Sequence, residues 1–294
     1  MNKLVSIAIP LRNEERYLKR TLESICAQTY SNLQIIIADN ASTDNSLQIA
    51  RDYAAQDSRI EVYAHNHNIG SLANFNFVFK ASRGDYFCWA SGHDLMHPDC
   101  IARCVGELEN RKEACLCHTA ALWIDETDNV TGRVLENQID TRGTSDAQSR
   151  AIVLMYGLGY ANPIYGLIRR SVLADTGLML PVIGADVVLL LELAFRGEFI
   201  FVDEPLRLAR MTDSACATHQ EYTRRYLIRC FGRLPDKKKL KKMYREMILA
   251  HLNVFWKHSP TRAAALLNVL SAYHALHIRH RIFRESLAGI AKDT

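Results

Sequence analysis

Apolar and polar positions alternate in regular blocks through the first third of the chain. Four apolar runs have the length and continuity of buried strands: 4–11, 33–38, 60–65 and 86–90. The segments between them carry apolar residues at helical spacing: 14–28, 44–55 and 71–82. Strands that alternate with helices in this way predict right-handed crossovers and a parallel sheet.

The pattern becomes less regular after Pro98. It predicts helices at 100–110, 151–158 and 187–196, and strands at 114–124, 164–168, 199–203 and 206–210. The polar stretch 132–150 is predicted as a long loop. From 220 to 290 the pattern is helical again, with breaks near Pro235 and Pro260.

Charge divides the chain at about the same place. Residues 224–294 hold 16 Lys and Arg against 4 Asp and Glu, whereas residues 1–223 hold 20 against 28. We therefore predict a main domain at 1–218 and a basic helical region at 219–294, with the boundary near 215–225. Within the main domain, 1–98 is expected to bind a nucleotide and 99–218 to face an acceptor.

Composition is that of an ordinary globular protein, with 48% hydrophobic and 23% charged residues among 294. No run approaches the roughly 18 apolar residues of a spanning helix. The N-terminus lacks the pattern of a signal peptide, so we expect a cytoplasmic protein. None of the eight cysteines forms a C-x-x-C pair. Buried free thiols are the expected state, and a zinc site is the alternative.

Polar side chains follow the first two predicted strands. Arg12 and Glu14 come after the first, and Asp39, Asn40 and Ser42 after the second. The carboxyl ends of parallel strands meet at one edge of a sheet, where ligands bind. Asp39 can accept from the imide N–H of a base, and its neighbours can bind hydroxyls or phosphate. The alternative is turn and capping chemistry, which suits Asp44 better than Asp39.

Three more residues carry candidate chemistry. Asp94 follows the fourth strand and can hold Mg²⁺ or Mn²⁺ against a diphosphate. His93 can be a second ligand for Mn²⁺ or a phosphate contact, or only a polar loop residue. Asp186 begins a helix, where it can be an N-cap or a general base toward an acceptor hydroxyl. Glu192 can face the same cleft as Asp186, but a solvated helix face is the favoured prediction.

Several fingerprints are absent. The chain has no G-x-G-x-x-G and no Walker loop, which argues against an oxidoreductase or a nucleoside triphosphatase. It has no G-x-S-x-G elbow, so an esterase has no support.

In combination, the motifs of residues 4–212 resemble those of inverting glycosyltransferases of family 2, which have the GT-A fold. The resemblance lies in these stretches: Ile9-Pro10-Leu11-Arg12-Asn13-Glu14-Glu15, Leu22-Glu23-Ser24-Ile25 with Gln28-Thr29-Tyr30, Ile36 to Asp44, Asn68-Ile69-Gly70 and Ser82-Arg83-Gly84-Asp85-Tyr86. It implies a mixed, mostly parallel sheet flanked by helices, with a helical C-terminal extension.

The resemblance also implies roles for single residues. Asp186 would be the base, and Asp94 the ligand of a Mg²⁺ or Mn²⁺ cofactor. Asp39 would face a uracil or thymine imide, with UDP-sugars favoured as donors. The nucleotide would be bound by ten residues: Pro10, Arg12, Glu14, Asp39, Asn40, Ser42, Asn68, Gly70, Ser91 and His93.

This chain departs from the family at Ser91 and His93, which replace two acidic residues common in relatives. Thr212 stands where some relatives place a metal-binding histidine, so a metal site would have few protein ligands. The implied reaction is direct displacement at the sugar C1 with inversion. Asp186 would deprotonate the acceptor, and Arg210 would help the metal to stabilise the leaving diphosphate.

The basic C-terminal region allows two interpretations. It can be a helical cap on the main domain, or residues 224–284 can contact anionic lipid at the inner face of the membrane, near a lipid-linked acceptor. No nucleic-acid-binding module accompanies it. For the whole chain, two alternatives to a transferase stay open: a catalytically silent module that binds a nucleotide or glycan, and a nucleotidyltransferase. The latter needs a glycine-rich loop that Leu11 to Arg16 does not provide.

Overall fold

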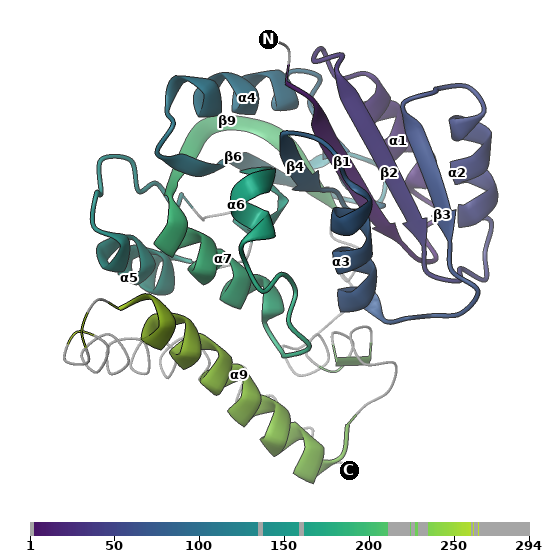
Figure 1. The fold of residues 1–294 in the computed structure, drawn as a ribbon. Coiled ribbons are helices and arrows are strands. Elements are labelled where there is room, and N and C mark those ends of the chain that lie inside the picture. The colour runs from purple at the N-terminus through teal and green to yellow at the C-terminus, as the bar shows by residue number, and fades with distance from the viewer. Residues whose placement is uncertain are drawn as a thin grey trace.

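The computed structural model describes residues 3–134, 138–158, 162–210, 224, 227–228, 235–259, 261 and 264. Among these residues the strands form one nine-stranded sheet, in the order β3-β2-β1-β4-β8-β6-β9-β5, with β7 paired to β6 alone. Figure 1 shows this sheet with helices on both sides. The α/β architecture, a sheet flanked by helices, is the one that the sequence predicted.

The first half of the sheet is parallel throughout. Its strands are β1 (Val5–Leu11), β2 (Leu33–Asp39), β3 (Ile60–Ala64) and β4 (Tyr86–Trp89). The helices between them are α1 (Leu18–Cys26), α2 (Ser46–Ala54) and α3 (Ser71–Ala81). All seven were predicted from the sequence, with ends that differ by a few residues.

Two apolar cores lie on opposite faces of the sheet, because side chains alternate along each strand. Ile7 and Ile9 of β1 pack with α1, α2 and α4 (Cys100–Asn110), whereas Ala8 packs with α3 and α7 (Ala185–Arg196). Both faces are therefore covered, which explains why the strands read as continuous apolar runs. Five of the cysteines are buried in these cores: Cys88, Cys100, Cys104, Cys115 and Cys117. Cys216 and Cys230 lie outside the described residues.

The second half of the sheet is mixed. It contains β5 (Leu95–Met96), β6 (Ala114–Ile124), β7 (Val130–Val134), β8 (Leu167–Arg169) and β9 (Glu198–Arg210). The prediction of two late strands was wrong, since β9 is continuous. It pairs with β6 through a register shift in which Val202 faces Thr119 and Pro205 faces Ala120. Pro205 has no N–H to donate, and the irregularity accommodates it without ending the strand.

The prediction of a loop over 132–150 was also partly wrong. β7 extends to Val134, and α5 (Ala147–Gly157) begins before the predicted helix. Asp146 caps α5 by accepting from the backbone N–H of Ser149 over 2.7 Å. An isolated Asp in a polar stretch is a weak signal for a cap, so the helix start was missed. The short elements η1 (Asn162–Tyr165) and α6 (Arg170–Ala174) flank β8.

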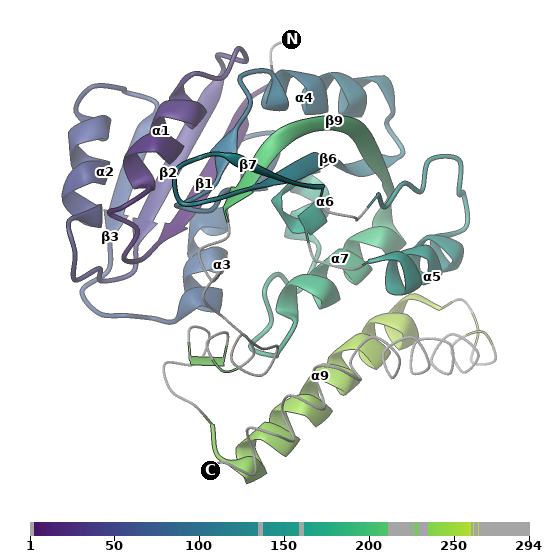
Figure 2. The ribbon, with the colours of Figure 1, turned by 180° about the vertical axis from the view of Figure 1, so that it is seen from behind.

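The hairpin of β6 and β7 crosses toward α1, as Figure 2 shows from behind. Its turn is held there by ion pairs, in which Arg16 contacts Glu126 at 2.5 Å and Arg20 contacts Asp128 at 2.6 Å. These contacts join the first half of the chain to the second near the ends of the parallel strands.

The basic region contains one long helix, α9 (Lys237–His258), which is drawn below α7 in Figure 1. Asp236 caps it by accepting from the N–H of Lys239 over 2.8 Å. It packs on α7, where the rings of Phe195 and Phe255 meet edge to face. No helix among the described residues is both long enough and apolar enough to cross a membrane. Of the predicted boundary near 215–225, Arg224 alone is among the described residues.

Candidate active site

The ends of β1 and β2 bring the first predicted residues together. The two strands pair in register, with Pro10 beside Ala38 and Leu11 beside Asp39. The backbone N–H of Asn40 continues this pairing by donating to the carbonyl of Leu11 over 2.8 Å. Residues that follow the two strands therefore leave the sheet at the same edge, as the sequence predicted.

Asp39 is the most unusual polar group at this edge. Only 1% of the residue is exposed. Its Oδ2 accepts from the N–H of Ser42 over 3.1 Å, but its Oδ1 is buried with no hydrogen-bond partner. A buried acceptor without a donor costs about 1–3 kcal/mol, so such a group needs an explanation, and a bound ligand is one. Asp39 is therefore placed to accept a hydrogen bond from a ligand.

Asn40 and Ser42 hold the surrounding loops. Oδ1 of Asn40 accepts from the N–H of Ile69 over 2.8 Å, which ties the loop before α3 to the end of β2. Oγ of Ser42 accepts from the N–H of Asn13 over 3.0 Å, which ties the loop after β1 to the same point. Both side chains thus shape the rim of the site.

The predicted residues of the third loop and Arg12 also contact backbone. Oδ1 of Asn68 accepts from the N–H of Gly70 over 2.9 Å, and Gly70 has φ +88°, a conformation that favours glycine. Nη1 of Arg12 donates to the carbonyl of Asn40 over 3.2 Å, and Arg12 is otherwise exposed at the rim. Ser71, which the sequence analysis did not select, has a buried hydroxyl without a partner at the start of α3.

Glu14, Ser91 and His93 form a chain of hydrogen bonds. Oε1 of Glu14 lies 3.0 Å from Nδ1 of His93, and Oγ of Ser91 lies 2.9 Å from Nε2. The contact is close because Gly92 packs on Glu14, and a Cβ on Gly92 would stand 2.9 Å from Cγ of Glu14. The loop after β4 is thus joined to the loop after β1.

Asp94 is held by two arginines of β9. Its Oδ2 accepts from Nη2 of Arg207 over 3.2 Å, and its Oδ1 accepts from the backbone N–H of Arg210 over 2.9 Å. Nε2 of His93 lies 3.9 Å from the same Oδ1. Glu14, His93 and Asp94 therefore form one partly exposed cluster.

Arg210 does not have the role that the sequence suggested. Its side chain is fully buried, lies over the ring of Tyr17 and donates to the carbonyl of His93 over 2.8 Å. The remaining guanidinium nitrogens contact Asp125 and Asp128 of the hairpin turn. A group so enclosed cannot reach a diphosphate, so Arg210 holds the hairpin and the His93 loop in place.

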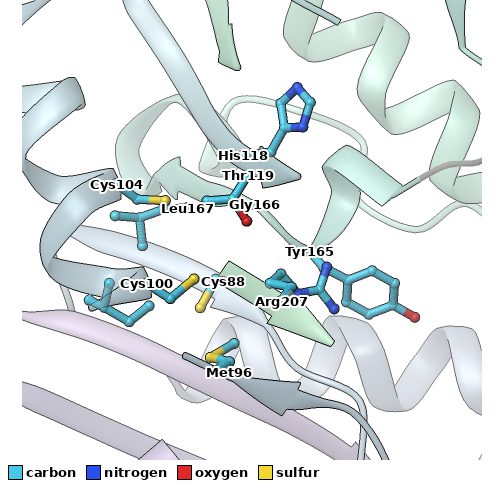
Figure 3. Close-up of a pocket in the computed structure, with 11 residues that line it drawn as sticks. Cys88, Met96, Cys100, Cys104, His118, Thr119, Tyr165, Gly166, Leu167 and Arg207 are labelled. Atoms are coloured by element: carbon cyan, nitrogen blue, oxygen red, sulfur yellow. The ribbon is translucent and has the colours of Figure 1, made fainter. Parts of the chain in front are cut away.

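Arg207 is a residue of the site that sequence reasoning missed. It lines a small pocket between α4 and the sheet, where Figure 3 shows its guanidinium beside the ring of Tyr165. The other lining side chains include Cys88, Cys100 and Cys104, and no predicted site residue lines this pocket. The signal in the sequence was an arginine within an apolar strand, because a buried cation requires a counter-charge.

Of the residues predicted near a metal, Asp94 and His93 lie side by side, with Nε2 of His93 3.9 Å from Oδ1 of Asp94. No cluster of three or more His, Cys, Asp or Glu side chains suited to a metal occurs in the part of the chain that is described. Asp94 and His93 offer one carboxylate and one imidazole, and cations such as Mg²⁺ fill the other positions with water and phosphate oxygens. Thr212 lies outside the described residues.

Asp186 lies in the first turn of α7. Its Oδ1 accepts from the N–H of Val187 over 2.9 Å, and the residue is partly exposed. The preceding Gly184 has φ +67° and turns the chain into the helix. The N-terminus of a helix stabilises a negative charge, which suits a carboxylate at this position.

Glu192 is buried, which corrects the prediction of a solvated position. Its Oε2 accepts from the N–H of Gly177 over 2.8 Å, and its Oε1 contacts Arg196 at 3.0 Å and Lys257 at 3.4 Å. Burial raises the pKa of Glu192, but these donors outweigh it and hold the pKa below the usual range. Glu192 therefore links α7 to α9 and to the turn at Gly177.

The model of glycosyl transferase family 2 matches residues 6–177 of the chain, more than half of its length. EpsE of Bacillus subtilis is 35% identical over 132 residues, 45% of this chain and 48% of that protein. The chondroitin synthase of Escherichia coli is 31% identical over 128 residues, 43% of this chain and 18% of that protein. The matched stretches thus span less than half of each relative.

Solved structures of the same fold cover nearly the whole chain. Staphylococcus aureus TarS (1–349), in complex with UDP-GlcNAc, aligns with a TM-score of 0.67 at 14% identity, over 94% of this chain and 73% of that one. The mannosyltransferase PcManGT of Pyrobaculum calidifontis, in complex with GDP-Man and Mn²⁺, aligns with a TM-score of 0.55 at 15% identity, over 93% and 74%. At these identities the likeness shows the fold alone.

Proposed function

Because the chain belongs to glycosyl transferase family 2, we propose that it moves a sugar from a nucleoside-diphosphate sugar to a hydroxyl of a glycan or lipid-linked acceptor, with inversion at the sugar C1. UDP-sugars are the favoured donors. The biological setting would be the synthesis of a cell-surface polysaccharide or glycoconjugate, because relatives include a chondroitin synthase.

The observation that carries the proposal is the buried, unpartnered Oδ1 of Asp39. It lies at the carboxyl end of β2, at the sheet edge where ligands of α/β proteins bind. The imide N–H of uracil would satisfy it, whereas cytosine has no such donor. Ser71 begins α3, directly after the loop that Asn40 holds through the N–H of Ile69. Its hydroxyl is a second buried group without a partner.

Asp186 would act as the general base. Its carboxylate would take the proton of the acceptor hydroxyl while the acceptor oxygen attacks C1 from the face opposite the diphosphate. The bond from C1 to the phosphate oxygen then breaks, and the nucleoside diphosphate leaves with the bonding electron pair. Only one carboxylate is needed, unlike the pair used in glycoside hydrolysis.

A divalent cation, Mg²⁺ or Mn²⁺, would be held by Asp94. It would supply positive charge to the phosphate oxygens. The chain's own contribution is to hold Asp94 in place through Arg207 and through the N–H of Arg210, at 3.2 Å and 2.9 Å. Ser91 and His93 would lie beside the diphosphate, because they occupy the same loop.

Two measurements test the proposal. Calorimetry should detect binding of UDP and weaker binding of CDP. GDP is titrated as a further competitor. A sugar-nucleotide hydrolysis assay, with water as acceptor, should show slow turnover that Asp186→Asn abolishes and that the exposed Asp175→Asn control retains. UDP binding without turnover of any sugar nucleotide would favour the silent module, and wild-type turnover in Asp186→Asn would refute the base.

A peripheral membrane contact from the cytoplasmic side is a further part of the proposal. Exposed cations lie on α9 at Lys238, Lys242 and Arg245, and the exposed Leu249 and Trp256 follow at helical spacing. Cations followed by apolar and aromatic groups on one helix face suit an anionic bilayer surface.

Vesicle sedimentation tests this contact. Changing the four lysines Lys238, Lys239, Lys241 and Lys242 to Gln should release the protein from anionic vesicles. The control changes an equal number of exposed cations elsewhere to Gln: Lys19, Arg51, Lys80 and Lys112. Equal sedimentation of wild type and both variants would refute the contact.

A further inference from the structure

Trp123 lies near the C-terminal end of β6, on the face of the sheet that carries Arg207. In the pairing of β6 with β9, Ala121 is opposite Arg207. Residues opposite each other on neighbouring strands project to the same face, and so do residues two apart along one strand. On this face the guanidinium of Arg207 donates to Oδ2 of Asp94 over 3.2 Å. Trp123 therefore shares a face with the proposed diphosphate site.

Two strand spacings separate Trp123 from Asp94. β9 lies between β6 on one side and β5 on the other, and its Ala209 is opposite Trp123. Leu95 of β5 is opposite Leu208, and this antiparallel register brings Asp94 beside Ala209. Neighbouring strands lie about 4.8 Å apart, so the Cα atoms of Trp123 and Asp94 are roughly 10 Å apart. A sugar ring linked to a diphosphate at Asp94 is therefore within reach of the indole.

Core packing does not explain a tryptophan at this position. In the part of the chain that is described, Trp123 packs against Ala121 and Ala209 in a small cluster that is separate from both large cores. Its side chain stays partly exposed, whereas Trp89 of β4 is completely buried in one of those cores. The two alanines present only methyl groups to the indole. Part of a large aromatic surface is thus left for a ligand.

Arg210 fixes the end of β6 to the loop that carries Asp94. Its Nε donates to the carbonyl of His93 over 2.8 Å, and its Nη1 contacts the carbonyl of Asp125, two residues after Trp123. One buried guanidinium thus joins the residue before Asp94 to the strand that carries the indole. Sites built on such fixed elements place their side chains more precisely than sites on loops.

We infer that the indole of Trp123 stacks on a pyranose ring next to the diphosphate, at the place where the sugar is transferred. A pyranose has a face of C–H groups that packs on an aromatic ring, and binding sites combine such apolar contacts with a few polar groups. The sugar of the donor and the terminal sugar of the acceptor both present this face. The inference rests on the proposed function, because Asp94 marks the diphosphate only if a sugar nucleotide binds there.

Calorimetry on wild type and Trp123→Leu tests the inference in two arms. The first compares UDP with UDP-GlcNAc, UDP-glucose and UDP-galactose, and a donor ring on the indole predicts about 10-fold weaker sugar-nucleotide binding in Trp123→Leu with unchanged UDP binding. In the second, methyl glycosides of the same three sugars are titrated onto the UDP complex, and a similar loss there assigns the ring to the acceptor. Trp123→Phe keeps an aromatic face and should restore most of the affinity in the arm that responds.

Tyr156→Leu is the matched control, because it removes an aromatic side chain that is 54% exposed on α5. It should bind every ligand as wild type does. Unchanged UDP binding in Trp123→Leu would show that this variant is folded. Equal affinities of wild type and Trp123→Leu in both arms would overturn the inference and leave the proposed function standing. Failure of the wild type to bind UDP would count against the proposed function itself.

Discussion

The side-chain amide of Asn76 clamps the backbone of Met179 in both directions. Nδ2 of Asn76 donates to the carbonyl of Met179 over 3.0 Å, and Oδ1 accepts from its N–H over 3.0 Å. Asn76 lies on α3, beside the parallel strands, whereas Met179 lies in the segment that leads to Asp186. The clamp therefore sets where the proposed base stands relative to the nucleotide half of the fold.

Replacing Asn76 should lower turnover without changing nucleotide affinity. Asn76→Ala leaves the N–H and the carbonyl of the buried Met179 unpaired, which costs about 1–3 kcal/mol for each group. Because Asp186 would lose its placement, we expect sugar-nucleotide hydrolysis to fall about 10-fold or more. The Kd for UDP should stay the same. Asn76→Asp keeps the acceptor, so its turnover should lie between those of wild type and Asn76→Ala. Wild-type turnover in Asn76→Ala would contradict the role of the clamp.

Replacing Asp39 by Asn should weaken UDP binding without lowering the free energy of unfolding. Asp39→Asn replaces a buried, unpartnered carboxylate oxygen, so the free energy of unfolding without nucleotide should stay level or rise. A hydrogen bond to a charged group contributes about 1.5–3 kcal/mol, so UDP affinity should drop about 10- to 100-fold. Urea unfolding and calorimetry measure the two effects. Asp44→Asn, a loop carboxylate bound to the N–H of Ser46, is the control for binding.

His118 should make the fold less stable in weak acid. Burial lowers its pKa to about 4, and its Nε2 donates to the carbonyl of Ile139 over 2.9 Å. Below the ordinary pKa near 6.5 the unfolded chain binds a proton that the folded chain does not. Unfolding therefore becomes easier as the pH falls toward 4, with a loss on the order of 2 kcal/mol at about pH 5.

Urea unfolding at about pH 7.5 and about pH 5 checks this, with the variant His118→Gln. Gln can still donate to Ile139 but does not titrate, so this variant should lose less stability between the two pH values. His97→Gln, at an exposed histidine, should behave as wild type. An identical pH dependence in wild type and His118→Gln would contradict the assignment.

Glu192 should hold α9 on the main domain. Glu192→Ala removes the buried carboxylate that pairs with Arg196 and accepts from the N–H of Gly177, so we expect a loss of about 3 kcal/mol in the free energy of unfolding. Because the pKa of Glu192 is depressed, this contribution to stability is complete at neutral pH. It is lost as the pH falls below the ordinary pKa of glutamate and through the depressed pKa of Glu192.

Hydrogen exchange along α9 measures the docking, with Glu246→Gln as the control. Glu246 is half-exposed and pairs with Lys242 at 3.7 Å, so its loss should change stability by less than about 1 kcal/mol. If Glu192→Ala leaves the protection of α9 from hydrogen exchange unchanged, Glu192 does not hold this helix on the main domain.

The first half of the fold could be predicted because its signals are local. Strands buried on both faces give continuous apolar runs, and the polar residues that follow them fall at one edge of the sheet. Asp39 was found in this way. β9 was misjudged because Pro205 and two charged residues interrupt its apolar run, while pairing with β6 keeps the strand continuous.

The sequence by itself determined the alternation of strands and helices, the family motifs, and the placement of Asp39, Asp94 and Asp186 at the ends of elements. Only the tertiary structure decided the partners of these groups. Glu14 meets His93 across 79 positions, Asp94 meets Arg207 across 113, and Asn76 meets Met179 across 103. Periodicity reports which face of an element is buried, but a hydrogen bond requires an approach of about 3 Å, which packing alone fixes.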